Sequence, residues 1–151
     1  MAKRSSSRRA FLGGAAGVAV AAGISNNVAA QSTAEINDPN VVREIEALFA
    51  SYDDALRNNN VAALNGFFFD SPTTVRFGVG ENLYGISEIA AFRAGRTTRP
   101  SVVRERIEVT TYGTDFATVA AAGGRGRTMQ TWVRFPQGWR IVAAHVSRIQ
   151  D

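Results

Sequence analysis

The apolar positions between residues 38 and 58 recur at spacings of three and four along the chain. This period predicts a helix of about twenty residues with one buried stripe. Asp38 suits the N-cap and Pro39 the first helical position, and the three asparagines at 58–60 are expected to end the helix. The predicted stripe consists of Val42, Ile45, Leu48, Phe49, Tyr52 and Leu56.

Shorter elements are expected next. Residues 61–68 have the pattern of a second helix, residues 73–77 and 82–84 of short strands around a glycine-rich turn, and residues 87–94 of a third helix capped by Ser87. After Pro100 the apolar period changes to two. This period predicts strands over residues 102–112, 116–122, 128–135 and 139–148, joined by turns with hairpin chemistry.

This order of elements predicts the fold class. Helices followed by a run of long antiparallel strands indicate an α+β domain. A strongly curved sheet wrapped around the first helix would leave a cone-shaped cavity, which suits a small molecule.

The last two predicted strands each carry polar groups interleaved with aromatic residues on one face. Such a face suits a cavity lining, and a half-exposed amphipathic face is the alternative. The residues expected to share a face are Thr128, Gln130, Trp132 and Arg134 on one strand, and Trp139, Ile141, Ala143, His145 and Ser147 on the other.

Residues 1–30 have the organisation of a twin-arginine export signal. Arg8 and Arg9 precede Phe-Leu, a weakly apolar stretch follows, and small residues lead to a cleavage site after Ala30. That stretch is about eleven residues long, whereas a transmembrane helix needs about 20. We expect export by the twin-arginine machinery, a periplasmic or secreted protein, and no stable membrane anchor after cleavage. A disordered basic tail and an uncleaved anchor are the alternatives.

The rest of the chain divides into a polar lead-in at residues 31–37 and one domain at residues 38–151. The whole chain has 17 Lys and Arg against 13 Asp and Glu. The export segment holds four of these cations and no acid, so that 13 basic and 13 acidic residues remain after cleavage. We therefore expect no nucleic-acid partner.

The chain contains no cysteine, and His145 is its single histidine. Disulfides, thiolate catalysis and zinc–thiolate sites are thereby excluded, and one chain cannot build a site from several histidines. We therefore expect neither a metal nor a cofactor.

Tyr52 and Arg76 are candidates for chemistry. Arg76 would lie on a short strand, where its guanidinium could clamp a carboxylate or a developing oxyanion. A tyrosine beside a cation could donate a proton. The alternatives are an exposed strand arginine and a core tyrosine with a hydrogen-bonded hydroxyl. Of the next two residues, Asp53 and Asp54, one is expected to face water.

Other residues are candidates for the lining of the cavity. Glu81 could be a general base or a solvated turn acid, and His145 a proton carrier or a structural histidine. Arg93, with Arg96 and Arg99, could attract anions at a cavity mouth or form a solvated cluster. The candidate lining consists of Glu81, Tyr84, Arg93, Gln130, Trp132 and His145.

Residues 74–85 read Thr-Val-Arg-Phe-Gly-Val-Gly-Glu-Asn-Leu-Tyr-Gly. This block resembles the signature of the AtzH-like family, which includes the HpxZ-like proteins of oxalurate catabolism, within the SnoaL-like, nuclear transport factor 2-like superfamily. Residues 91–93, 111–118, 130–134 and 138–147 are similar as well, so that the resemblance spans residues 37–149. It implies a cone-shaped α+β fold, with N-terminal helices packed in a curved, mostly antiparallel sheet, and a homodimer formed through the outer sheet surface.

The resemblance also implies a function. It implies small carboxylated or urea-like substrates and a cofactor-free, decarboxylating amide hydrolysis with Tyr52 and Arg76 as the active pair. A non-catalytic small-anion-binding or accessory protein is the alternative, favoured by the Ala- and Gly-rich residues 120–127. An isomerase or cyclase of the ketosteroid-isomerase type is a third candidate, and it would need a carboxylate base opposite an acidic tyrosine.

Overall fold

The computed structural model describes residues 35–150. The chain divides into two compact units, Met1–Ser32 and Thr33–Asp151, and all described residues belong to the second unit. The predicted export segment and its cleavage site after Ala30 lie outside the described residues. None of the helices described here is long and apolar enough to cross a lipid bilayer.

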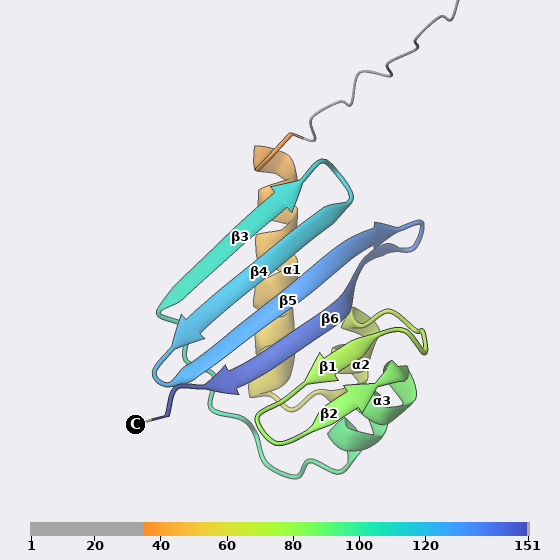
Figure 1. Ribbon diagram of the computed structural model, residues 1–151, viewed down its shortest axis with the longest axis vertical. Coiled ribbons are helices and arrows are strands. Elements are labelled where there is room, and N and C mark those ends of the chain that lie inside the picture. Colours follow the sequence, from red (N-terminus) through yellow and green to blue (C-terminus); the bar gives the residue numbers. More distant parts are fainter. Residues whose placement is uncertain (1–34, 151) are drawn as a thin grey trace, which may run out of the picture. The chain divides into compact units, whose positions relative to one another are not determined.

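The frame of the second unit is one six-stranded sheet (Figure 1). Its strands are β1 (Val75–Phe77), β2 (Asn82–Tyr84), β3 (Arg106–Tyr112), β4 (Phe116–Gly123), β5 (Gly126–Phe135) and β6 (Gly138–Arg148). Their order is β2-β1-β6-β5-β4-β3, and only β1 and β6 pair in parallel among the described strands. The α+β class is confirmed, and the sheet is mostly antiparallel, as the resemblance implies, with one parallel pair.

Three helices accompany the sheet: α1 (Pro39–Arg57), α2 (Val61–Phe67) and α3 (Gly85–Ala94). The long α1 crosses one face of the sheet behind β3, β4 and β5, whereas α2 and α3 lie at the end that carries β1 and β2 (Figure 1). We call the face toward α1 the inner face and the opposite one the outer face.

The first helix begins and ends as its sequence predicts. Oδ1 of Asp38 accepts hydrogen bonds from the backbone N–H groups of Asn40 and Val41 at 2.8 and 3.4 Å, and Pro39 follows as the first helical residue. Asn58 is the C-cap. The fully buried positions of the helix are Val41, Ile45, Phe49, Tyr52, Asp53 and Ala55.

The predicted cap of the third helix is wrong. The helix begins at Gly85, and Tyr84 occupies the N-cap without a side-chain hydrogen bond. Glu88 satisfies this end instead, because its Oε2 accepts from the backbone N–H of Tyr84 at 2.8 Å. Gly85 has φ +79° and packs against the backbone of Pro72, so a side chain there would be strained.

The strand predicted from residue 102 begins only at Arg106. The preceding chain leaves the ladder because Arg104 turns to an ion pair with Asp53 on α1. It also passes so close to Gly123 that a Cβ there would collide with the backbone of Val103. Tertiary contacts thus override a local apolar alternation.

Simple alternation also fails on β6. Trp132 pairs with Ile141, whereas the preceding Thr131 pairs with Ala143, so that β6 carries one extra residue at Val142. This bulge reverses the facing of every later residue. Trp139 and Ile141 are buried on the inner face as predicted, but Ala144 replaces Ala143 and His145 there.

The core lies between α1 and the inner face of the sheet. It is filled by large side chains that retain at most 2% exposure. These are Ile45, Phe49, Leu64, Phe68, Ile89, Val119, Trp132 and Ile141. At one end this core gives way to charged groups.

Candidate functional site

A small cavity lies among the second half of α1, α2, β1, α3 and the segment after α3. About 20 Å³ remains between its side chains, which is room for one water molecule. A larger ligand therefore requires some of these side chains to move apart. The walls are formed by Tyr52, Leu56, Asn59, Leu64, Arg76, Phe92, Arg93, Arg96 and Pro100.

Arg76 enters the cavity from the centre of β1. Its neighbours Val75 and Phe77 point to the outer face, so Arg76 points inward, where it is 7% exposed. Its Nη1 donates to Oε1 of Glu81 at 2.6 Å, and its Cζ lies 5.1 Å from the centre of the Phe92 ring. A charge pair and an aromatic face thus hold this buried guanidinium.

Glu81 reaches Arg76 from the turn between β1 and β2. The backbone N–H of Gly78 donates to the carbonyl of Glu81 at 2.7 Å, and the N–H of Gly80 donates to its Oε2 at 3.2 Å. A Cβ at position 78 would collide with the carboxylate of Glu81. The glycine therefore gives this carboxylate its place against Arg76.

Arg93 lies on the inward stripe of α3, four residues after the fully buried Ile89. It is 4% exposed, and its Cζ lies 4.5 Å from the centre of the Phe68 ring. Among the described residues, its Nη1 has no hydrogen-bond partner. A guanidinium is thus buried with one donor nitrogen left over.

The electrostatics of this end of the cavity are strongly positive. Burial lowers the pKa of Arg93 below its usual range, and repulsion from Arg76 and Arg96 acts in the same direction. The interaction and hydrogen bond with Tyr52 oppose this effect. Glu81, which is paired with Arg76, is the one nearby carboxylate among the described contacts of these arginines.

Tyr52 is both a core residue and a neighbour of a cation, the two alternatives that its sequence position left open. Its ring lies in the core, 6.3 Å from that of Phe49 and 5.7 Å from that of Phe67 between centres. The residue is 4% exposed, yet its hydroxyl interacts with Arg93 at the cavity. A phenol held beside a guanidinium is suited to hand over a proton.

The segment after α3 closes the cavity, and we call residues 95–105 the strap. At its start, the carbonyl of Arg96 accepts from Nδ2 of Asn59 at 3.2 Å. Near its end, Nε and Nη2 of Arg104 donate to the two carboxylate oxygens of Asp53, both at 2.8 Å. Pro100 lies between these points and lines the cavity. Both ends of the strap are therefore tied to α1 or to the residues that follow it.

Tyr52, Arg76 and Arg93 line one cavity, with Glu81 bonded to Arg76. Gln130 and Trp132 do not join them. Both are buried in the core, at 1% and 0% exposure, and Nε1 of Trp132 donates to Oε1 of Gln130 at 3.0 Å. Their assignment to the lining of this cavity is corrected.

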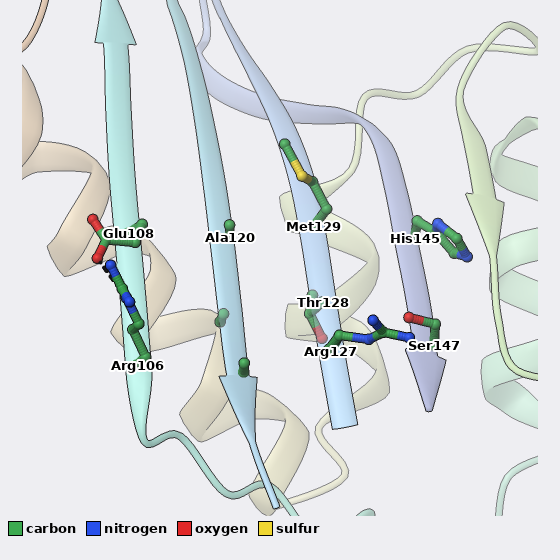
Figure 2. Close-up of a pocket in the computed structure, with 10 residues that line it drawn as sticks. Arg106, Glu108, Ala120, Arg127, Thr128, Met129, His145 and Ser147 are labelled. Carbon is green, nitrogen blue, oxygen red and sulfur yellow. Dashed lines mark hydrogen bonds and ion pairs between the residues drawn. The ribbon is translucent and has the colours of Figure 1, made fainter. Parts of the chain in front are cut away.

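Tyr84 and His145 lie on the other side of the sheet. Tyr84 is 58% exposed, and its ring centre lies 5.7 Å from that of Phe77, which in turn lies 6.5 Å from that of His145. Figure 2 shows His145 on the outer face beside Met129. His145 faces outward because the β6 bulge reverses the facing of the residues after it. The predicted placement of Tyr84 and His145 in the cavity is therefore corrected.

Sequence reasoning missed several parts of the site. The ring of Phe92 lies against the guanidinium groups of Arg76 and Arg96. The sequence indicated this residue only because it directly precedes Arg93 on the same predicted helix. Of the two acids after Tyr52, Asp54 faces water, whereas Asp53 is buried and paired with Arg104. No local pattern connects two residues that are 51 positions apart.

Within residues 35–150, no group of three or more His, Asp or Glu side chains gathers in a way that could hold a metal ion. What the cavity offers is a phenol and guanidinium groups. These groups can bind an anion, donate protons and stabilise negative charge.

Comparison with solved structures shows close relatives. A protein of unknown function from Pectobacterium atrosepticum is 45% identical, with a TM-score of 0.72, over 76% of this chain and 95% of that chain. A cystatin-like fold protein from Burkholderia xenovorans is 42% identical, with a TM-score of 0.71, over 78% of this chain and 98% of that chain.

A nuclear transport factor 2-like superfamily protein from Salmonella enterica is 23% identical, with a TM-score of 0.63, over 75% of this chain and 94% of that chain, and shows the same fold. A comparison with curated proteins finds no match. The model of the AtzH-like family matches residues 34–151, which cover the whole described unit. The chain therefore belongs to the AtzH-like family.

Proposed function

We propose that the cavity binds a small carboxylated molecule and that the protein acts on it as a cofactor-free hydrolase. The substrate class would be a carboxylated amide or urea-like compound, as expected for the HpxZ-like branch of oxalurate catabolism. One observation carries the proposal. The guanidinium of Arg93 is buried beside Tyr52 and Arg76, and its Nη1 has no partner within the described part of the chain.

A guanidinium is costly to bury unless its donors are satisfied and its charge is paired. Arg93 has the aromatic face of Phe68 and the hydroxyl of Tyr52, but no acidic side chain is bonded to it among the described residues. A carboxylate has two oxygens in the geometry that a guanidinium fork prefers. A carboxylated ligand would therefore supply both the charge and the acceptors that this site lacks.

The same groups suit the removal of a carboxyl group from nitrogen. When the bond between nitrogen and the carboxyl carbon breaks, its electron pair stays on nitrogen and spreads onto the adjacent carbonyl oxygen. The carboxyl carbon leaves as carbon dioxide, and the nitrogen takes up a proton. Hydration of the carbon dioxide to bicarbonate makes the net reaction a hydrolysis. Arg76 would stabilise the developing negative charge, and Tyr52 would deliver the proton.

The test is the release of carbon dioxide, and of the decarboxylated amide or urea, from a panel of small ureas and amides that carry a carboxyl group on nitrogen, by the purified protein. Tyr52→Phe and Arg76→Ala should each lower kcat on the order of 10²-fold or more if these groups act in the transition state. Arg99→Ala, in the exposed part of the strap, is the matched control and should leave kcat unchanged. An unchanged kcat in Arg76→Ala would remove Arg76 from the mechanism.

A small-anion-binding protein without turnover is the second candidate. It is favoured by the lack of an unpaired carboxylate beside Tyr52 among the described residues, since Glu81 is bonded to Arg76 and Asp53 to Arg104. The same observation weighs against an isomerase, which needs a carboxylate base. Tight binding of the panel compounds without product release would establish this second candidate.

The proposal includes a homodimer and export. The outer face of the sheet has an open depression of about 580 Å³, and Figure 2 shows its floor of Ala120 and Met129 between charged residues. Exposed apolar side chains of this kind favour an interface with a second copy. The twin-arginine segment at residues 1–30 supports a periplasmic or secreted location.

A further inference from the structure

We propose that Glu81 is a displaceable internal carboxylate, which occupies the place on Arg76 that a ligand carboxylate takes by exchange. The inference rests on the proposed function, because it requires a carboxylated ligand at Arg76. It makes Glu81 a specificity-determining residue. A ligand without a carboxylate has nothing with which to replace the bond that Glu81 makes.

A ligand carboxylate could bind Arg76 more strongly than Glu81 does. Glu81 holds Arg76 through one pair of atoms, Oε1 and Nη1, at 2.6 Å. Its other oxygen accepts from the backbone N–H of Gly80. A ligand carboxylate could instead form two parallel hydrogen bonds with the guanidinium, and bidentate pairs of this kind are the stronger ones.

The two partners also differ in their access to water. The side chain of Arg76 is 8% exposed, whereas that of Glu81 is 24% exposed. A displaced Glu81 carboxylate can therefore be hydrated at the rim, while Arg76 stays buried and needs a new anion. Exchange satisfies both groups. If Glu81 left without a replacement, the buried guanidinium of Arg76 would lose its acidic partner, as a second unpaired guanidinium beside Arg93.

The pairing of β1 and β2 does not depend on the bond between the Glu81 carboxylate and Arg76. Gly78 has no Cβ, and the carboxylate of Glu81 lies where a Cβ would be. The backbone bond from Gly78 to the carbonyl of Glu81 closes the turn independently of that side chain. The carboxylate can therefore leave Arg76 without opening the pairing of β1 and β2.

Exchange also limits the space that a ligand carboxylate needs at Arg76, although Glu81 itself is not a wall residue of the cavity, which has about 20 Å³ of free space. The group that must leave is a carboxylate of the same size, so that the ligand carboxylate replaces it rather than adding to it. The ligand would then lie between Arg76 and the unpartnered Nη1 of Arg93.

The experiment measures ligand affinity by titration calorimetry on the purified full chain. The probe is oxamate, a small carboxylated amide, and oxamide is its neutral counterpart. Glu81→Gln keeps the shape of the side chain and removes its charge. Gly78→Ala keeps the charge and pushes the carboxylate aside through the added Cβ. Val79→Ala, an exposed change in the same turn, is the matched control.

Both Glu81→Gln and Gly78→Ala should bind oxamate about tenfold more tightly than the wild type, because a competing charged hydrogen bond is gone. Val79→Ala should bind like the wild type, and oxamide should gain nothing in any variant. When Arg76→Ala is combined with Glu81→Gln, the gain in oxamate affinity that Glu81→Gln gives alone should disappear. Because Glu81→Gln removes the charge and Gly78→Ala keeps it, agreement of the two variants would separate exchange from a change in net charge.

Three results would overturn the inference. If the wild type binds oxamate and both variants bind it equally well, Glu81 does not compete, and the proposed function stands. If Glu81→Gln binds oxamate more weakly, Glu81 supports the ligand instead of competing with it. If no form of the folded protein binds oxamate or the other carboxylated amides, the exchange and the proposed function fail together.

Discussion

A buried guanidinium with a donor left over opposes folding, and Arg93 is such a residue. Burial lowers its pKa, which means that the charged form is less favourable in the folded chain than in the unfolded chain. This penalty is present at every pH below the lowered pKa and is relieved only above it. A residue that lowers stability in this way is typical of a binding site.

Replacing Arg93 by Met should therefore raise stability and remove ligand binding. Met fills a similar volume without a charge, and such replacements of buried ionic groups can stabilise a protein by about 1–4 kcal/mol. We expect the lower end, since the contacts with Phe68 and Tyr52 are also lost. Urea unfolding measures the first effect and oxamate titration the second.

The control is Arg99→Met, which changes an exposed arginine six positions further along the chain. It should alter neither the free energy of unfolding nor the affinity for oxamate. A variant Arg93→Met that is less stable and still binds oxamate would show that Arg93 serves the fold rather than the ligand.

At this scale the sequence identifies the chemistry better than the location. Tyr52, Arg76 and Arg93 are candidates by residue type, the family resemblance favours the first two, and all three line one cavity. Gln130 has the same polar character, but it lies in the core against Trp132. Alternation states only which residues share a face, and it does not state how far along that face the cavity extends.

Among the elements, the strap is the one that sequence patterns describe least. Apolar alternation from residue 102 indicated a strand, yet the chain there follows Pro100 of the cavity wall and bonds with α1. The ion pair between Asp53 and Arg104 is responsible, with side-chain exposures of 4% and 13%. Because both charges are shielded from water, the removal of one partner leaves the other uncompensated.

Asp53→Asn should lower the free energy of unfolding by about 3 kcal/mol, the usual cost of breaking a buried pair from one side. It should also loosen the strap, so that trypsin cleaves faster after Arg96 and Arg104. Chemical unfolding and limited proteolysis measure the two effects.

Asp54→Asn is the matched control, since the neighbouring carboxylate is 75% exposed and its pair with Arg57 is a surface pair. It should change stability by less than about 0.5 kcal/mol. Equal stabilities for the two variants would mean that Asp53 does not hold the strap.

The β6 bulge shows why the facing of a strand is harder to predict than its existence. The strand was predicted within one residue of its observed start at Gly138. The extra residue at Val142 appears only where β6 pairs with β5, and a few residues later His145 lies beside Phe77 of β1. Pairing with two distant strands sets this irregularity, and a single segment carries no sign of it.

For the whole molecule, the outer face of the sheet is the surface that the described elements leave uncovered. Strand register places Glu108, Ala120, Met129 and His145 in one row across four strands. Met129 is 50% exposed at the middle of this row. Arg106 on β3 and Arg127 on β5 lie along one side of the row (Figure 2). Figure 1 shows none of the described helices on this side of β3–β6.

A two-fold axis through this face would make the row self-complementary. Each apolar floor would meet its own copy, and the arginines of one protomer could approach Glu108 of the other.

Met129→Arg should place a like charge from each protomer at the centre of such an interface and shift a homodimer toward monomers by at least about tenfold in dissociation constant. Sedimentation equilibrium measures this shift, with Val79→Arg, on the exposed turn, as the control that should leave it unchanged. A wild-type protein that stays monomeric at high concentration would refute the interface, and the outer face would then need another partner to account for its exposed Met129.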